Sequence, residues 1–237
     1  HIYDRYDRIG GLLMYGIPGF KLEKSIVERR GQLLIDGGVH FHLGVDIGGE
    51  TSFADIRAKH DAILVATGVY KARDIAAPGS GLDGIVPALE YLTVSNRKSL
   101  GDDVAAFDSG ALNAEGKDVV VIGGGDTAMD CVRTAIRQKA KSVSCLYRRD
   151  RANMPGSQRE VQNAEEEGVV FKWLSAPQAF LGDDKVRAVQ AQRIHLGQPD
   201  ATGRQVPEVI DGSAHELPAD MVIKALGFDP EDLPTMF

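Results

Sequence analysis

Residues 118–130 constrain the fold of this chain more than any other part of the sequence. Four apolar residues give a short buried strand, three glycines turn the chain, and a helix is expected from Asp126 onward. Gly123, Gly125 and Ala128 give the G-x-G-x-x-A form of a dinucleotide-binding fingerprint, which brings backbone N–H groups close to a pyrophosphate. A plain strand–turn–helix is the alternative interpretation. The candidate binding residues of this stretch are Gly123, Gly125, Asp126, Thr127 and Asp130.

The next expected strand, residues 141–147, leads into Arg148, Arg149 and Asp150. A site selective for NAD would place an acidic residue here to accept hydrogen bonds from the ribose 2′-OH. Two adjacent guanidinium groups instead suit a 2′-phosphate, because their planar donors match phosphate oxygens. The sequence therefore predicts NADP(H). Two alternatives stay open: the arginines form a solvated rim, or the Asp150 carboxylate takes the ribose role.

Ser157 and Glu160 have the spacing of a capping box, which predicts a helix that starts there and ends near Gly168. Arg159 falls in the first turn of this helix, where a cation opposes the helix dipole. A nearby anion would justify that position, so Arg159 is a candidate third phosphate ligand. A solvated arginine is the alternative.

The start of the chain carries half of a second fingerprint. Ile2 and Tyr3 end in Asp4, and a glycine turn follows at Gly10 and Gly11. An acidic residue at a strand end is placed for a ribose hydroxyl, and the glycine-rich first half would lie about 20 to 30 residues upstream of it, where this sequence has no residues. We therefore expect a piece of a longer protein, in which one dinucleotide-binding fold occurs twice.

The remaining pattern predicts alternating helices and strands, with a domain boundary in the loop at residues 109–116. Residues 12–20 are apolar and fit neither period, so we expect them to pack on a core or a cofactor ring. The expected helices are 21–37, 51–60 and 88–98, and the expected strands are 39–45, 62–66 (buried), 169–174, 186–194 and 219–225.

Composition excludes several classes of function. The 237 residues carry 27 Lys and Arg against 34 Asp and Glu, a net charge of −7, which argues against binding to nucleic acid or to an anionic membrane. No apolar run approaches the ~20 residues of a membrane span, and no signal peptide is visible. Cys131 and Cys145 form neither a C-x-x-C pair nor an iron–sulfur set, so we expect core thiols and a cytoplasmic location. His40, His42, His195 and His215 are scattered and are interpreted as non-catalytic.

Five motifs in the sequence form a specific combination. They are Gly-Gly-Leu-Leu-Met-Tyr-Gly-Ile-Pro from residue 10, Ala-Thr-Gly from 66, Gly-Gly-Gly-Asp-Thr-Ala-Met-Asp from 123, Tyr-Arg-Arg-Asp-Arg-Ala-Asn-Met-Pro-Gly from 147 and Ala-Leu-Gly-Phe from 225. Together these motifs resemble the NADPH-dependent glutamate synthase small subunit, a module that also occurs in dihydropyrimidine dehydrogenase. The match covers nearly the whole chain, and Asp4 stands where that family usually has Glu.

The resemblance implies an α/β fold of two Rossmann-like domains, with an NADPH domain inserted in an incomplete FAD domain. It implies a partial FAD domain at residues 1–112, an NADPH domain at 113–227 and the start of the return to the FAD domain at 228–237. The implied reaction is hydride transfer from NADPH to FAD. The 4Fe-4S clusters of the family would lie in an N-terminal region outside these residues. The implied partner is the glutamate synthase large subunit, which makes glutamate from glutamine and 2-oxoglutarate.

No side chain need act as acid or base in this reaction, so we expect no catalytic residue and no metal ligand. Asp130 matches an acidic position near the nicotinamide in similar flavoenzymes, and a helix-surface carboxylate is the alternative. Because the first flavin glycine loop is not in the sequence, we expect the chain alone to be inactive and to hold FAD weakly. The flavin-side candidates are Asp4, Gly10, Gly11, Leu12, Val45, Ala66, Thr67, Gly68 and Gly227.

Other functions compete with this one. A dihydropyrimidine dehydrogenase-type protein would use the same module to feed electrons to a different partner. A non-enzymatic nucleotide-binding module is disfavoured by the flavin-type segment at residues 10–18. A thioredoxin-reductase-like enzyme would need a second cysteine beside Cys131, and the sequence has none there.

Overall fold

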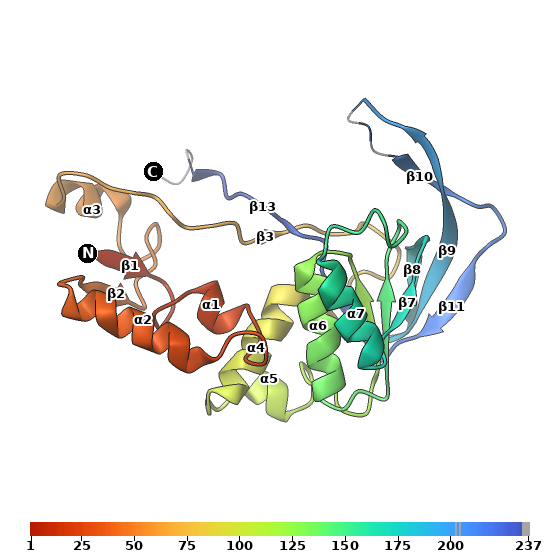
Figure 1. The fold of residues 1–237 in the computed structure, drawn as a ribbon, viewed down its shortest axis with the longest axis horizontal. Helices are drawn as coiled ribbons and strands as arrows, with labels where there is room; N and C mark the ends of the chain where they lie inside the picture. The colour runs from red at the N-terminus through yellow and green to blue at the C-terminus, as the bar shows by residue number, and fades with distance from the viewer. Residues whose placement is uncertain (202, 204, 234–237) are drawn as a thin grey trace. The chain divides into compact units, whose positions relative to one another are not determined.

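The computed structural model describes residues 1–201, 203 and 205–233, which form two compact units (Figure 1). The first unit is His1–Lys71 together with the chain from Phe228 onward, and the second is Ala72–Gly227. The second unit thus interrupts the first, as the inserted-domain prediction requires. The chain passes between them at β3 (Lys71–Ala72) and β13 (Phe228–Asp229), which pair with each other.

The second unit is built on a five-stranded sheet in which every neighbouring pair is parallel. Parallel strands buried on both faces read as continuous apolar runs, which is why Val-Val-Val-Ile marks the central strand so clearly. In spatial order the strands are β4 (Ile85–Pro87), β12 (Met221–Lys224), β5 (Asp118–Ile122), β6 (Ser142–Leu146) and β7 (Val170–Lys172).

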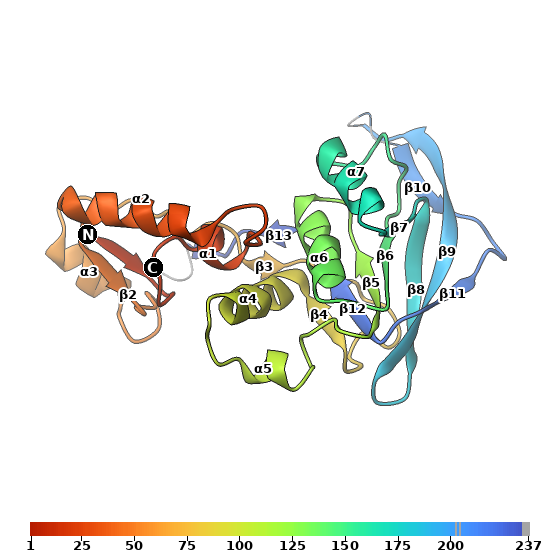
Figure 2. The same cartoon turned by 60° about the horizontal axis from the view of Figure 1, so that its bottom comes forward.

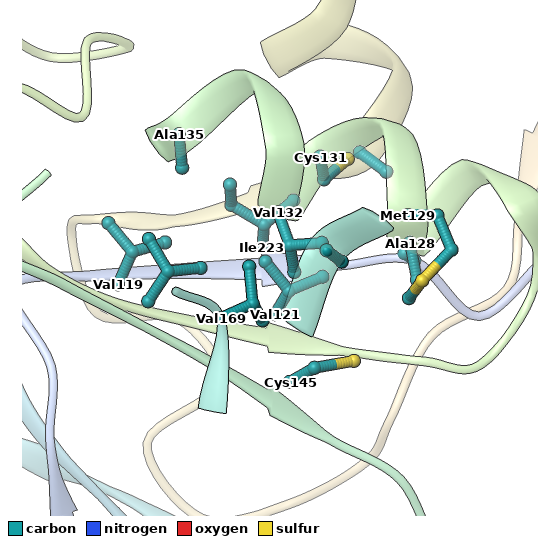
Figure 3. Close-up of a cluster of buried hydrophobic side chains, with 14 of the residues drawn as sticks. Val119, Val121, Ala128, Met129, Cys131, Val132, Ala135, Cys145, Val169 and Ile223 are labelled. Atoms are coloured by element: carbon teal, nitrogen blue, oxygen red, sulfur yellow. The ribbon is translucent and has the colours of Figure 1, made fainter. Parts of the chain in front are cut away.

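Helices cover one face of this sheet and an antiparallel sheet covers the other (Figure 2). Val119 and Val121 face the helices, where α6 places Ala128 and Val132 against them (Figure 3). Their neighbours Val120 and Ile122 point to the opposite face and pack on the antiparallel sheet. The helices are α4 (Ala88–Ser99), α6 (Asp126–Arg137) and α7 (Gln158–Glu166), with the short α5 (Ala105–Asp108) beside α4; the antiparallel strands are β8 (Ser175–Gly182), β9 (Val186–Pro199), β10 (Gln205–Val209) and β11 (His215–Pro218).

The first unit contains one parallel pair with a helix between its strands in sequence, β1 (Ile2–Asp4), α2 (Lys24–Asp36) and β2 (Phe41–Leu43). Figure 1 shows α2 running alongside the pair. Two shorter helices complete the unit, α1 (Leu12–Tyr15) and α3 (Phe53–Lys59). No helix in the described part of the chain combines the length and the apolar character needed to cross a lipid bilayer.

Most elements expected from the sequence are confirmed within a few residues, and two differ. The expected buried strand at 62–66 is wrong: those residues form no regular element and Leu64 is 89% exposed, because no described strand pairs with them. Residues 12–20 do contain a helix, the single turn α1, which buries Met14 and Tyr15. The domain boundary expected at 109–116 lies inside the second unit, because β4 pairs with β12 and α4 packs on α6.

Candidate dinucleotide site

The three glycines after β5 have different surroundings. Gly123 has a φ of +147°, and a Cβ there would lie 2.1 Å from the Ala225 carbonyl oxygen. A Cβ on Gly124 would lie 2.3 Å from the ring of Tyr147. At Gly125 no described atom lies within 4 Å of the corresponding position. The first two glycines therefore allow close packing, whereas the third leaves open space where a ligand can approach the backbone.

The open glycine is also the N-cap of α6, and no described side chain caps this helix. The first N–H groups of a helix have no partner within it and carry a partial positive charge, which together favour an anion. One turn later Ala128 and Met129 are fully buried against the sheet, so the start of the helix is held firmly. Asp126 is exposed and Thr127 is half-buried at the mouth of this turn.

The strand register brings the arginine segment to the same edge of the sheet as the glycine turn. Ile122 at the end of β5 lies opposite Leu146 at the end of β6. The N–H of Gly123 continues this ladder by donating to the Leu146 carbonyl at 3.1 Å. The carboxyl edge of a parallel sheet is where ligands of such folds bind.

Arg148 and Arg149 lie together there but in different environments. Arg148 is exposed, and its side chain makes no hydrogen bond or ion pair with any described residue. Arg149 is half-buried, and its Nη2 donates to the Gln205 carbonyl of β10 at 3.4 Å. Its Nε is buried without a partner among the described residues, a state that an arriving acceptor would relieve.

Asp150 is engaged within its own loop. Its Oδ1 accepts hydrogen bonds from the backbone N–H of Asn153 at 2.9 Å and from Asn153 Nδ2 at 2.8 Å. One carboxylate oxygen thus shapes the turn after β6. Arg148, not Asp150, is the exposed charge at this strand end, which favours the phosphate interpretation over the ribose one.

The loop that follows β6 is tied to the glycine turn, a feature the sequence did not reveal. The N–H of Gly156 donates to the Gly124 carbonyl, and the N–H of Ser157 donates to Asp126 Oδ1, both at 3.0 Å. Tyr147 lies against Gly124 and donates from its hydroxyl to the Asn153 carbonyl at 3.2 Å. The bonds from Gly156 and Ser157 join residues more than 30 positions apart, so local pattern gives no sign of them.

The predicted capping box is wrong. Ser157 is the N-cap of α7, but its side chain makes no cap bond with any described residue. Glu160 instead accepts from Arg133 Nη1 of α6 at 2.7 Å. Arg159 is exposed in the first turn of α7, and its side chain has no ion pair within the described residues. Arg151 pairs with Glu165 at 2.9 Å and so belongs to α7 packing.

An ion-pair network fixes α7 on α6. Glu167, at the end of α7, accepts from both Arg137 and Arg133 at 2.7 Å. The hydrogen bond from Arg137, followed by that from Arg133, lowers the pKa of the Glu167 carboxyl to about 2. Arg133 itself is 9% exposed and joins Glu160 to Glu167. Both ends of α7 are therefore anchored.

Asp130, one turn into α6, is only 8% exposed, so the alternative of a helix-surface carboxylate is wrong. Its position one turn beyond the glycine loop keeps it a candidate for the nucleotide site. The proximity of its carboxylate contributes, after burial, to raising the pKa of the neighbouring Cys131 thiol.

The candidates for the flavin side lie in the first unit, except Gly227. Asp4 Oδ1 accepts from the N–H of Tyr6 at 3.0 Å, and the Asp4 carbonyl accepts from the N–H of Val45 at 3.0 Å. Gly10 has a φ of +117°, and a Cβ there would lie 2.4 Å from Val27, so α2 packs directly on this turn.

The other flavin-side candidates are less enclosed. Gly11 is the N-cap of α1, which begins at Leu12. Ala66, Thr67 and Gly68 are exposed and belong to no regular element. Gly227 has a φ of +89° in the second unit, where its carbonyl accepts from the N–H of Arg73 at 3.0 Å. The structure thus places two separate groups of candidates, one in each unit.

Residues 26–235 match the family model described as pyridine nucleotide-disulphide oxidoreductase. The chain belongs to this family. It is 68% identical over 237 residues to the glutamate synthase (NADPH) small chain of Azospirillum brasilense, and this match covers all of this chain and 49% of that protein. It is 65% identical over 236 residues to the putative glutamate synthase (NADPH) small chain of Cereibacter sphaeroides, covering 100% of this chain and 56% of that protein. The predicted resemblance is confirmed, and the chain spans about half the length of these relatives.

The fold is similar to that of FprA from Mycobacterium tuberculosis, solved in complex with NADPH. The TM-score is 0.81 at 19% identity, and the match covers 98% of this chain and 64% of that one. At this identity the likeness concerns the fold alone. It confirms the predicted α/β class with Rossmann-like domains.

The cysteines of this family member are not arranged for disulphide chemistry, which needs exposed, ionisable thiols. Cys131 and Cys145 are both free and fully buried. Burial raises the pKa of the Cys145 thiol to about 12 and that of Cys131 well above its usual range. The prediction that both are core residues is confirmed.

The histidines were interpreted wrongly in part, because His40 and His42 are not scattered. In the first unit the His1 ring stacks on both His40 and His42, and the Tyr3 ring contacts His42 and His60. His1 Nδ1 and His42 Nε2 are 2.8 Å apart. The alternation of His40 and His42 near β2, beside β1, is the signal that could have indicated it. Within the described residues no group of three or more side chains is placed to hold a metal ion.

Proposed function

We propose that this chain is the nucleotide- and flavin-binding part of an NADPH-dependent flavin oxidoreductase of the glutamate synthase type. In this proposal NADPH binds at the carboxyl edge of β5 and β6, and the first unit holds part of FAD. When bound, the two cofactors supply a hydride transfer from nicotinamide to flavin. The electrons then pass to a large subunit that makes glutamate from glutamine and 2-oxoglutarate.

The observation that carries the nucleotide assignment is the open position at Gly125 on an uncapped helix of 12 residues. A pyrophosphate fits there, because it accepts from the first N–H groups of α6 without meeting a side chain. Arg148 and the unpartnered Nε of Arg149 lie on the neighbouring strand end. A 2′-phosphate accepts from both, and Arg159 is a third donor in the same proposal.

The flavin assignment rests on the first unit. Asp4 keeps one carboxylate oxygen beyond the one that Tyr6 occupies, and this oxygen can accept from a ribose hydroxyl. In this proposal the turn at Gly10 and Gly11 and the segment at residues 66–68 supply further backbone groups to FAD. We expect the chain alone to bind FAD weakly. The iron–sulfur clusters of the proposed parent would lie outside these residues.

Calorimetric titration of the chain with NADPH and with NADH tests the nucleotide assignment. Changing both Arg148→Ala and Arg149→Ala should weaken NADPH by about 30- to 1000-fold, since each hydrogen bond to a charged group contributes about 1.5 to 3 kcal/mol before screening by solvent. NADH should be almost unaffected, and the preference should shrink as salt rises. Of the two single changes, Arg148→Ala should leave the fold untouched because its side chain is exposed.

Two further variants make the result specific. Arg187→Ala removes an equally charged side chain, 67% exposed, from β9 and should change neither affinity. Gly125→Ala places a methyl group in the open space and should weaken both nucleotides alike. Equal losses of NADPH and NADH in the double arginine variant would assign the arginines to shared phosphates or to the fold, and NADP(H) selectivity would be wrong.

The final acceptor of the electrons from NADPH is tested in the full-length protein with its large subunit. NADPH oxidation should then require both glutamine and 2-oxoglutarate. Oxidation that proceeds with a different acceptor, and not with these two, would overturn the glutamate synthase assignment but leave the nucleotide site intact.

A further inference from the structure

Asp126 is a negatively charged residue at the place where the proposed site would bind a negatively charged pyrophosphate, so binding phosphate alone does not explain it. It is an exposed carboxylate in the first turn of α6, beside the open space at Gly125. A carboxylate repels a pyrophosphate, although it does favour the positive end of the helix dipole. Its Oδ1 is directed to a different task, since it accepts the backbone N–H of Ser157 at 3.0 Å.

We propose that Asp126 is a positioning residue, which holds the arginine-bearing loop at residues 148–157 on the glycine turn and thereby sets the preference for NADPH over NADH. This inference rests on the proposed nucleotide site. In this inference Asp126 contributes to the preference for NADPH without contacting the 2′-phosphate itself.

The loop has bonds of its own, such as those from Asn153 to Asp150 Oδ1, but these do not join it to the glycine turn. Residues 148–157 contain no helix or strand. Besides the bond to Asp126, the loop is joined to the turn by the bond from Gly156 to the Gly124 carbonyl. A Cβ on Gly156 would lie 3.1 Å from the Gly124 oxygen, so the two backbones are in close contact. The two bonds on consecutive residues form a clamp between the turn and the loop.

The clamp also sets where α7 begins. Ser157 is the N-cap of α7, and one turn later Glu160 is held by Arg133 of α6. With both points fixed, Arg159 between them is presented from a fixed helix start. The clamp therefore connects the pyrophosphate turn to Arg148 at one end of the loop and to Arg159 at the other.

The bond can be deleted from either side. Asp126→Ala removes the acceptor, and Ser157→Pro removes the donor; the φ of −57° at Ser157 already suits proline. Asp126→Asn removes the charge but keeps an oxygen that can accept. The readout is the ratio of the NADH and NADPH dissociation constants, measured by calorimetry on the full chain, with the urea midpoint recorded for each variant.

We expect Asp126→Ala and Ser157→Pro each to reduce the NADPH preference about 10-fold, and the double variant to reduce it no further, because both delete one bond. Asp126→Asn should stay within about 3-fold of the unaltered chain. It carries the same loss of charge as the alanine variant, so it separates the bond from the effect of charge on the helix and on the phosphates.

Three outcomes would overturn the inference. If alanine and asparagine both tighten NADPH and NADH equally, Asp126 acts only as a repelling charge. If the effects of the alanine and proline changes add, they do not report one bond. If the NADPH preference stays within about 2-fold of the unaltered chain in both deletions, the loop needs no clamp. Equal affinity of the unaltered chain for both nucleotides would instead overturn the NADPH assignment, and this inference with it.

Discussion

The two units contain the same connection, a strand followed by a helix and a parallel strand, but they bury it to different depths. In the second unit Val119, Val120, Val121 and Ile122 of β5 are each at most 4% exposed. In the first unit Ile2 of β1 is 41% exposed. The β5 strand has a neighbour on each side and a layer on each face, whereas β1 pairs with β2 alone in its described sheet.

This difference shows that a strand becomes buried because other strands pair with it and other layers pack on it. An apolar sequence alone is not sufficient. Residues 62–66 are all apolar, like the last four residues of β5, yet they form no strand and Leu64 is 89% exposed. A single extended segment leaves its backbone groups without partners, and water then satisfies them better than the protein does.

The largest expected contrast is between Ile223→Ala and Leu64→Ala. Ile223 of β12 is fully buried on the face of the sheet that the helices cover, so its truncation leaves a cavity and should cost about 2 to 5 kcal/mol. Leu64 has almost no contacts to lose, and its truncation should change stability by less than about 0.5 kcal/mol. Urea unfolding followed by circular dichroism gives both midpoints. A large loss for Leu64→Ala would mean that residues 62–66 are buried in solution.

A second contrast concerns charge. Glu167→Gln should cost about 1 to 3 kcal/mol at pH 7, because the carboxyl accepts from Arg133 and Arg137. The folded pKa, about 2, is below the ordinary value of 4.5, so the contribution is fully present above pH 4.5 and is lost as pH falls toward 2. Urea midpoints of the two proteins should therefore converge between pH 4.5 and 2.

The matched change in the first unit is Glu28→Gln, on the exposed side of α2. It should stay within about 0.5 kcal/mol of the unaltered chain at pH 7. If Glu167→Gln behaves in the same way at every pH, the network between α6 and α7 does not stabilise the second unit.

The sequence predicted what depends on local pattern. The β5 strand, the glycine turn and α6 follow from neighbouring residues, because the apolar run, the glycines and the helical period all lie within 20 positions. The opening at Gly125 and the adjacency of Arg148 follow from the fingerprint. The sequence could not predict contacts between distant residues, such as Ser157 with Asp126 or Glu160 with Arg133, since they depend on how α7 is set against α6.

The smallest contrast tests this limit at two helix starts, one in each unit. In α3, Ser52 Oγ accepts from the N–H of Asp55 at 3.1 Å and donates to Asp55 Oδ2 at 2.7 Å, a real side-chain cap. In α7, Ser157 has the capping sequence but makes no such bond with described residues. Ser52→Ala should therefore weaken its helix by about 1 kcal/mol, whereas Ser157→Ala should have almost no effect, since its backbone N–H still donates to Asp126. Amide hydrogen exchange in α3 and α7 measures each cost locally. The opposite result would be faster exchange in α7 of the Ser157→Ala variant and unchanged exchange in α3 of the Ser52→Ala variant. It would mean that the Ser157 side chain caps α7, as the capping-box sequence predicts, and that the Ser52 side chain does not stabilise α3.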